Sequence, residues 1–192
     1  MINYPIKKKT TNIKVSSSSN RGMDLEQALN ETNEYYLNND IAVIYKKPIP
    51  IQIVKVDYPS RDKAKISEAY YKIPSTTDYN GIFQNKYIDF EAKECHNKTA
   101  FPLANIHEHQ VEFMRNYEKQ DGVAFVLISY THRNQFYYMR FRELFGFWNR
   151  MLEGGRKSFR YEELDERFFL KETPGVFIPY LDTLQKDLDY RD

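Results

Sequence analysis

The sequence predicts a single α/β domain in which helices flank a mixed β-sheet and one long segment projects from the core. Three observations predict this fold. Helical and strand patterns follow one another in the order helix, strand, insertion, hairpin, helix, strand, strand. A chain of 192 residues is long enough for one domain with a substantial core. The chain contains no internal repeat.

The N-terminal segment is predicted to lie outside this domain. Residues 1–21 include five basic residues and no acidic ones, and four consecutive serines without hydrophobic periodicity. Such a segment buries little apolar surface, so we expect residues 1–21 to be a mobile basic tail. The domain itself is expected to span residues 22–192.

Two elements are expected before the insertion. Apolar and small residues recur at helical spacing over residues 24–38, which predicts a helix with Asp24 as its N-cap. Residues 41–45 form a short apolar run that predicts a buried strand.

Residues 46–75 predict an insertion that projects from the core. Pro48 and Pro50 interrupt the preceding strand, residues 51–56 resume a strand pattern, and residues 64–72 are basic and aromatic. The alternative is an ordinary β-meander with prolines at its edges.

A hairpin over residues 81–93 follows the insertion. We expect Asn80 and Gly81 to take the positive φ angles of a tight turn that fixes the direction of Asp78. On the strand over residues 87–93, alternation places Asp89, Glu91 and Lys93 on one side.

This arrangement predicts a site for phosphodiester chemistry. Asp78 and Glu91 can supply the carboxylate oxygens that a hard divalent cation prefers. Lys93 stands about 6–7 Å from Glu91 along the strand, close enough for the two to share one substrate phosphate, whose developing negative charge Lys93 can stabilise. The alternative is that Glu91 and Lys93 form a solvated pair on an exposed strand.

The remaining elements complete the sheet and its helices. Residues 94–103 are expected to form a loop, and residues 106–119 a helix capped by Asn105. Residues 123–130 predict a continuous apolar strand, followed by a turn and a strand over residues 135–139. Two further helices are expected over residues 142–151 and 180–188.

Composition narrows the class of protein. The net charge is only +1, yet residues 46–72 carry seven basic residues against three acidic ones, and the tail is basic throughout. Segregated basic surface indicates a polyanionic partner. One cysteine excludes an internal disulfide and a cysteine-based zinc site. No apolar run has the length of a transmembrane helix, so we expect a cytoplasmic protein without a membrane partner.

Several motifs in order resemble the RecU family of Holliday junction resolvases, which belongs to the PD-(D/E)xK nuclease superfamily. The motifs are Asn20-Arg21-Gly22, Lys46-Lys47-Pro48, Ser75-Thr76-Thr77-Asp78-Tyr79-Asn80-Gly81, Ile88-Asp89-Phe90-Glu91-Ala92-Lys93-Glu94, Phe101-Pro102-Leu103, His109-Gln110, Asp121-Gly122 and Phe147-Trp148. They cover nearly the whole chain except its extreme ends. The resemblance implies a restriction-endonuclease-like core with a stalk over residues 46–75.

The resemblance also implies the site and its cofactor. The family's metal ligands correspond to Thr76, Asp78, Glu91 and Gln110, and its transition-state-stabilising lysine corresponds to Lys93. The implied cofactor is Mg²⁺, for which Mn²⁺ can substitute. A hard oxygen donor set of this kind is chemically consistent with Mg²⁺.

The implied activity is symmetric cleavage of four-way DNA junctions by a homodimer, in homologous recombination and DNA repair. A set of cationic and aromatic residues is expected to contact branched DNA: Arg21, Lys46, Lys47, Arg61, Tyr70, Tyr71 and Lys72. The strand-exchange recombinase is a further expected partner. The alternatives are another endonuclease on the same core, or a DNA-binding accessory protein that modulates strand exchange.

Overall fold

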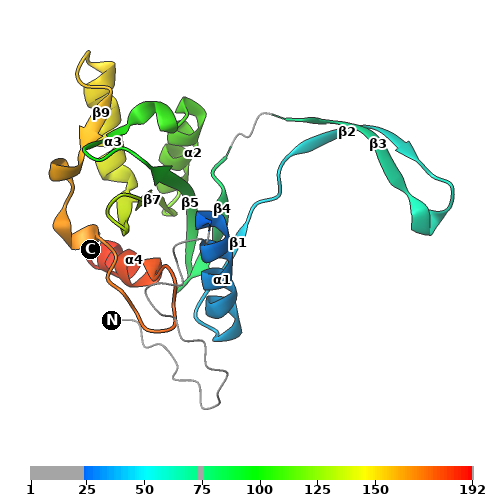
Figure 1. The fold of residues 1–192 in the computed structure, drawn as a ribbon, viewed down its shortest axis with the longest axis horizontal. Coiled ribbons are helices and arrows are strands. Elements are labelled where there is room, and N and C mark those ends of the chain that lie inside the picture. The colour runs from blue at the N-terminus through cyan, green and yellow to red at the C-terminus, as the bar shows by residue number, and fades with distance from the viewer. Residues whose placement is uncertain (1–23, 73–75, 192) are drawn as a thin grey trace.

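The protein is a mixed α/β body from which one hairpin projects (Figure 1). The computed structural model describes residues 24–72 and 76–191. The central sheet has the strand order β1-β4-β5-β7-β8, formed by Val43–Lys46, Tyr79–Phe83, Lys86–Cys95, Val123–Tyr130 and Gln135–Arg140. Strands β5 and β7 are parallel, and the other neighbours are antiparallel. The predicted mixed sheet is thus confirmed.

Helices cover both faces of this sheet. They are α1 (Leu25–Asn38), α2 (Glu108–Glu118), α3 (Phe141–Leu152) and α4 (Tyr180–Asp189). Tyr180 of α4 contacts Tyr36 of α1 and Phe90 of β5, so α1 and α4 share one face. Helix α2 packs against β5 and β7 from the other face and contacts α3. All four predicted helices are present.

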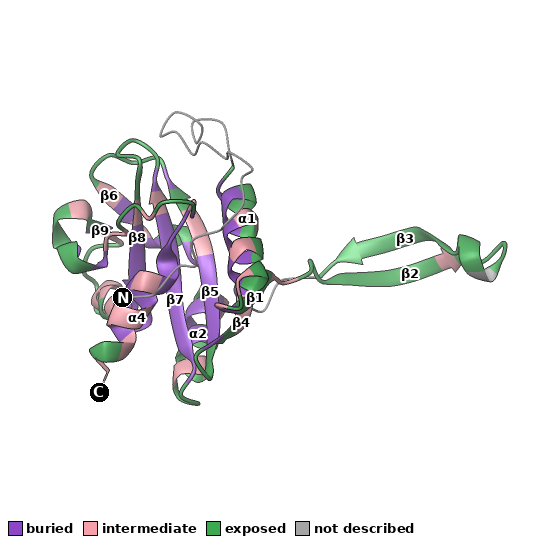
Figure 2. Cartoon of the chain, turned by 90° about the horizontal axis from the view of Figure 1, so that it is seen from below, coloured by how far each residue is buried: buried purple, intermediate pink, exposed green. Residues whose placement is uncertain are grey.

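Strand β7 forms the centre of the hydrophobic core. Its residues from Val123 to Ile128 are buried on both faces, as the continuous apolar run predicts (Figure 2). Phe90 of β5 stacks on Phe125 of β7 with ring centroids 4.7 Å apart. Phe125 in turn stacks on Tyr138 of β8, which extends this aromatic layer across three strands.

The predicted insertion is a two-stranded hairpin that leaves the body of the protein (Figures 1 and 2). Strand β2 (Ile51–Asp57) pairs with β3 (Lys65–Tyr71), and η2 (Arg61–Lys63) lies at the tip. Within residues 24–72 and 76–191, the hairpin strands pair only with each other. These strands thus leave the central sheet as a separate hairpin, and the meander alternative is wrong.

Some predicted boundaries are wrong for local reasons. Strand β1 is an edge strand on which Val43 and Tyr45 are exposed, because among the described residues it pairs only with β4. Helix α2 begins at Glu108, with His107 rather than Asn105 at the N-cap. Residues 94–103 are not all loop, because β5 continues to Cys95 and β6 (Ala100–Pro102) pairs with β9 (Ser158–Arg160). Besides η2, the described residues contain the short helical turns η3 (Leu103–Asn105), η4 (Tyr161–Glu163) and η5 (Glu166–Phe168).

The tight turn of the β4–β5 hairpin lies at Gln84 and Asn85, not at Asn80 and Gly81. Gln84 and Asn85 have φ angles of 47° and 62°, which fit a two-residue hairpin turn. Gly81 lies within β4 opposite Ile44 of β1. A Cβ at Gly81 would lie 2.6 Å from the Ile44 Cα, so glycine is required there by the close approach of β1.

Candidate active site

Strand β5 presents two predicted functional side chains, those of Glu91 and Lys93, toward α2. Glu91 is only 1% exposed, and its Oε1 lies 2.7 Å from the Lys93 Nζ. The predicted alternation along β5 is therefore confirmed. Because Glu91 is almost fully buried, the reading of Glu91 and Lys93 as a solvated surface pair is wrong.

Asp78 reaches the same place from the chain that enters β4. The pairing of Tyr79 with Phe90 brings Asp78 opposite Glu91, and the Asp78 amide donates a hydrogen bond of 3.1 Å to Glu91 Oε2. Burial raises the pKa of Glu91, and the negative charge of Asp78 raises it further. The ammonium of Lys93 acts in the opposite direction. The two carboxylates are thus close enough to repel each other.

Gln110 approaches Glu91 from the first turn of α2. Its side-chain oxygen accepts a 3.0 Å hydrogen bond from the His107 amide, which closes the capping box of α2. Its side chain also forms a hydrogen bond with Glu91 that favours the ionised carboxylate. Gln110 is buried at the start of α2 and not exposed on the helix surface.

Thr76 is the remaining member of the predicted ligand set. It is the first described residue after the hairpin, and its hydroxyl donates a 3.3 Å hydrogen bond to the Thr77 carbonyl. Thr76 therefore lies two residues before Asp78 on the same short segment.

The donor set fits a hard divalent cation. Two carboxylates, one amide and one hydroxyl offer the oxygen atoms that such a cation prefers. In the described part of the chain, no group of three or more His, Cys, Asp or Glu side chains could hold a metal ion. Two of the four predicted ligands, Thr76 and Gln110, are neutral oxygen donors.

A surface hollow of about 180 Å³ opens beside Asp78. Its lining includes Asp24 and Glu26 from the start of α1, Glu94 from β5, and Lys46 from the end of β1. Lys46 forms an ion pair with Glu26. Asp78 is thus approached from the surface, whereas Glu91 lies in the interior. The sequence did not single out Glu26 and Glu94, because they enter this hollow only through the packing of α1 against β5.

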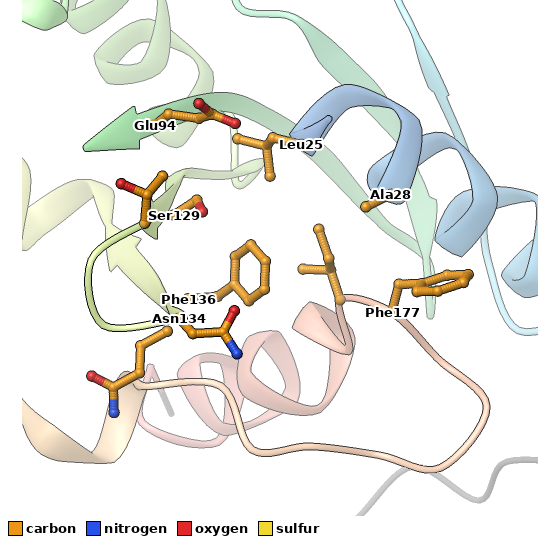
Figure 3. Close-up of a pocket in the computed structure, with 10 residues that line it drawn as sticks. Leu25, Ala28, Glu94, Ser129, Asn134, Phe136 and Phe177 are labelled. Carbon is orange, nitrogen blue, oxygen red and sulfur yellow. The ribbon is translucent and has the colours of Figure 1, made fainter. Parts of the chain in front are cut away.

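A second hollow of about 260 Å³ lies between α1, the ends of β5 and β7, and the segment before α4 (Figure 3). Leu25, Phe136 and Phe177 contribute its apolar lining, and Glu94 and Ser129 contribute polar groups. None of its lining residues is a predicted site residue, although it shares Glu94 and Leu25 with the hollow beside Asp78. We therefore assign the candidate active site to the Asp78–Glu91 region.

The predicted DNA contacts occupy different environments. Tyr70 and Tyr71 are 61% and 82% exposed on β3, and Lys72 is exposed just after it. Lys47 is directed into the protein and lies 2.5 Å from the Asp89 carboxylate. Arg21 and the basic tail lie outside the described residues, as does the Arg61 side chain, although the Arg61 backbone forms part of η2. The described helices include none that is long and apolar enough to cross a membrane.

Asp89 is the site neighbour that sequence reasoning did not assign. It is buried on the same face of β5 as Glu91 and contacts Lys47 and Thr77. Burial raises its pKa to about 6, against the opposing charge of Lys47. The strand alternation places Asp89 on the same side as Glu91, which was the signal in the sequence that could have assigned it to the site. Its partners Lys47 and Thr77 come from distant parts of the chain, so no local pattern predicts them.

Comparison with known proteins relates this site to one family. The family model described as recombination protein U matches residues 20–186, which include every predicted site residue. The Holliday junction resolvase RecU of Bacillus cereus (strain B4264) is 56% identical over 156 residues, covering 81% of this chain and 78% of that protein. The protein of the same name from Bacillus mycoides is 54% identical over 156 residues, with the same coverage of 81% and 78%. The Bacillus cytotoxicus protein of that name is 52% identical over 164 residues, covering 85% and 82%.

Proposed function

Since the chain belongs to the recombination protein U (RecU) family, we propose that it is an endonuclease that resolves Holliday junctions in recombination and repair. The observation that carries this proposal is the meeting of Asp78, Glu91 and Lys93 beside a buried strand. Relatives that are 52–56% identical are named Holliday junction resolvases.

Thr76, Asp78, Glu91 and Gln110 would hold Mg²⁺, or Mn²⁺ in its place. The bound cation would supply positive charge at the reacting phosphate and lower the pKa of a coordinated water. Gln110 and the Asp78 amide each hold the Glu91 carboxylate by a hydrogen bond, so that its oxygens are oriented before a cation arrives.

Lys93 has a separate role in this proposal. Its ammonium is held next to Glu91 by the 2.7 Å ion pair and is about one-quarter exposed. It can therefore reach a phosphate at the surface while Glu91 stays buried. A positive charge in a partly desolvated position stabilises the negative charge that develops on the phosphate oxygens.

Symmetric cleavage of a four-way junction requires two such sites, and we place the dimer contact on the hairpin. Ile51, Ile53, Val54 and Ile66 are exposed on β2 and β3, and an isolated two-stranded hairpin is marginally stable in water. A second hairpin would cover these apolar side chains. Tyr70, Tyr71 and Lys72 would remain available to stack on bases and pair with phosphates.

The function is tested by measuring binding and cleavage separately. Asp78→Ala and Glu91→Ala should retain binding of a four-way junction and lose Mg²⁺-dependent cleavage, because the carboxylates contribute to chemistry more than to affinity. Glu153→Ala is the control, because Glu153 is an exposed carboxylate at the end of α3, away from the proposed ligand set and from the hollow beside Asp78. Cleavage by both site variants at the wild-type rate would refute the proposed site.

The same assay separates the alternative functions. Equal cleavage of a linear duplex and a junction would indicate another endonuclease on this core. Junction binding and altered strand exchange, without cleavage by the wild-type protein, would indicate an accessory protein.

A further inference from the structure

Asp89 lies at the base of the projecting hairpin, where both of its connections to the body meet. The outgoing connection passes through Lys47, just after β1, and the return connection passes through Thr77, just before β4. Lys47 Nζ lies 2.5 Å from Asp89 Oδ2, and the Thr77 hydroxyl donates a hydrogen bond to Asp89 Oδ1. One buried carboxylate therefore binds both connections, one with each oxygen.

Two further contacts close this arrangement. Lys47 Nζ also lies 3.2 Å from the Thr77 hydroxyl, and the Lys47 amide donates a 2.7 Å hydrogen bond to the Asp78 carbonyl. The ammonium sits 4.8 Å from the ring centroid of Phe113 on α2. Asp89, Lys47, Thr77 and Phe113, which we call the hairpin clamp, thus join β5, α2 and both connections.

The hairpin clamp adjoins the carboxylates of the candidate active site. Asp89 and Glu91 are two residues apart on the same face of β5, and Thr77 immediately precedes Asp78. The Asp78 amide reaches Glu91 Oε2 while its carbonyl accepts from Lys47. The Asp78 backbone is therefore held at its amide by Glu91 and at its carbonyl by Lys47.

Stability alone is a weak reason for such a buried ion pair. Asp89 is 1% exposed and the Lys47 side chain 18% exposed, so both lose much of their hydration. Replacing a buried ion pair with packed apolar residues is often neutral or stabilising. What a charged, hydrogen-bonded cluster provides in addition is a defined geometry for the groups that it binds.

We propose that Asp89 is a positioning residue that holds the two connections of the hairpin together and thereby places Asp78 against Glu91. The inference rests on the proposed function, because it assigns Asp89 a role in the same cleavage reaction. It also gives Lys47 a role that does not require DNA contact. Through the clamp, the element that would bind the junction is anchored within two residues of each catalytic carboxylate.

The test uses the full-length protein and two variants of different severity. Asp89→Asn removes the charge, and Thr77→Val removes one hydroxyl while nearly preserving shape. Asp187→Asn and Thr32→Val are matched controls: Asp187 is a buried carboxylate paired with Arg142 and Arg191, and the buried Thr32 hydroxyl bonds the Ala28 carbonyl. Both control residues contact other elements than the hairpin clamp.

Two readouts distinguish positioning from general stability. Asp89→Asn should lower the single-turnover rate of junction cleavage by about 10- to 100-fold, the usual effect of removing a group that orients ligands. Thr77→Val should lower the rate less, and junction affinity should change by less than about threefold in both. Hydrogen exchange of the Asp78 amide, measured without metal or DNA, should accelerate in both variants because its bond to Glu91 weakens.

The outcomes separate this inference from the proposed function. If Asp89→Asn and Thr77→Val match their controls in cleavage rate and in Asp78 exchange, the positioning role is refuted. If the wild-type protein does not cut junctions, the proposed function fails, and the exchange measurement still decides whether Asp89 orders Asp78. Equal exchange in the variants and the controls would refute the clamp in that case also.

Discussion

Gly81 provides a sharp test of how the sheet positions the hairpin. Replacing it with alanine would add a Cβ atom 2.6 Å from the Ile44 Cα and closer still to the Val43 carbonyl oxygen. Both obstacles are backbone atoms of β1, so no side-chain rotation can relieve the overlap. Strand β1 must move away from β4, or β4 must distort.

The expected loss in the free energy of unfolding depends on the contacts that are disrupted when β1 moves away from β4. Overpacking typically costs about 1–3 kcal/mol where neighbouring side chains can yield. Here the neighbour is a strand backbone that pairs over four residues, from Val43 to Lys46. We therefore expect Gly81→Ala to lower the free energy of unfolding by about 3 kcal/mol or more, because strand pairing is lost in addition.

Urea denaturation measures this loss, and a second glycine provides the matched control. A Cβ at Gly146, within α3, would meet nothing within 4 Å. Gly146→Ala should therefore stabilise the protein by about 0.5–1 kcal/mol through helix propensity. If Gly81→Ala unfolds within about 0.5 kcal/mol of the wild type, the close approach of β1 and β4 is wrong.

Two further predictions concern the hairpin and an ion pair. Replacing residues 49–72 with a short Gly-Ser linker should leave the urea midpoint of the body nearly unchanged, because the hairpin strands pair only with each other in the described chain. The same replacement should abolish the proposed dimerisation and the preference for junctions. Analytical ultracentrifugation and competition binding against linear duplex measure this, and a dimer that persists would refute the hairpin contact. In the folded state, the hydrogen bond from Arg150 is the main cause that lowers the pKa of Glu163. The ionised Glu163 side chain therefore stabilises the protein above about pH 4.5, and this stabilisation is lost as the pH falls through the lowered pKa. Glu163→Gln should lower the free energy of unfolding by less than about 1 kcal/mol at pH 7, since the ion pair with Arg150 is partly exposed. The free energies of unfolding of the variant and the wild type, measured with urea, should become equal near about pH 3. A difference that does not change with pH would contradict this prediction.

The helices, the central strands and the projecting hairpin can be predicted from local features of the sequence. Their signals are local: helical spacing in α1, the continuous apolar run of β7, and prolines on either side of Ile49. The common face of Asp89, Glu91 and Lys93 also follows from neighbours along one strand. Strand alternation requires no knowledge of the rest of the fold.

Which distant groups meet at the site depends on how the whole chain packs. Asn80 and Gly81 carry a turn signal, yet the turn lies at Gln84 and Asn85 because β1 pairs with β4. Gln110 reaches Glu91 only because α2 begins at Glu108 with a capping box.

Asp89 shows the physical reason most directly. Its carboxylate meets a hydroxyl 12 residues away and an ammonium 42 residues away. Such contacts depend on strand order, register and helix packing, which are properties of the whole chain and leave no periodic signal near Asp89. Local periodicity thus predicts which face of β5 carries the site residues. Which groups from other elements meet them there follows from the assembled sheet.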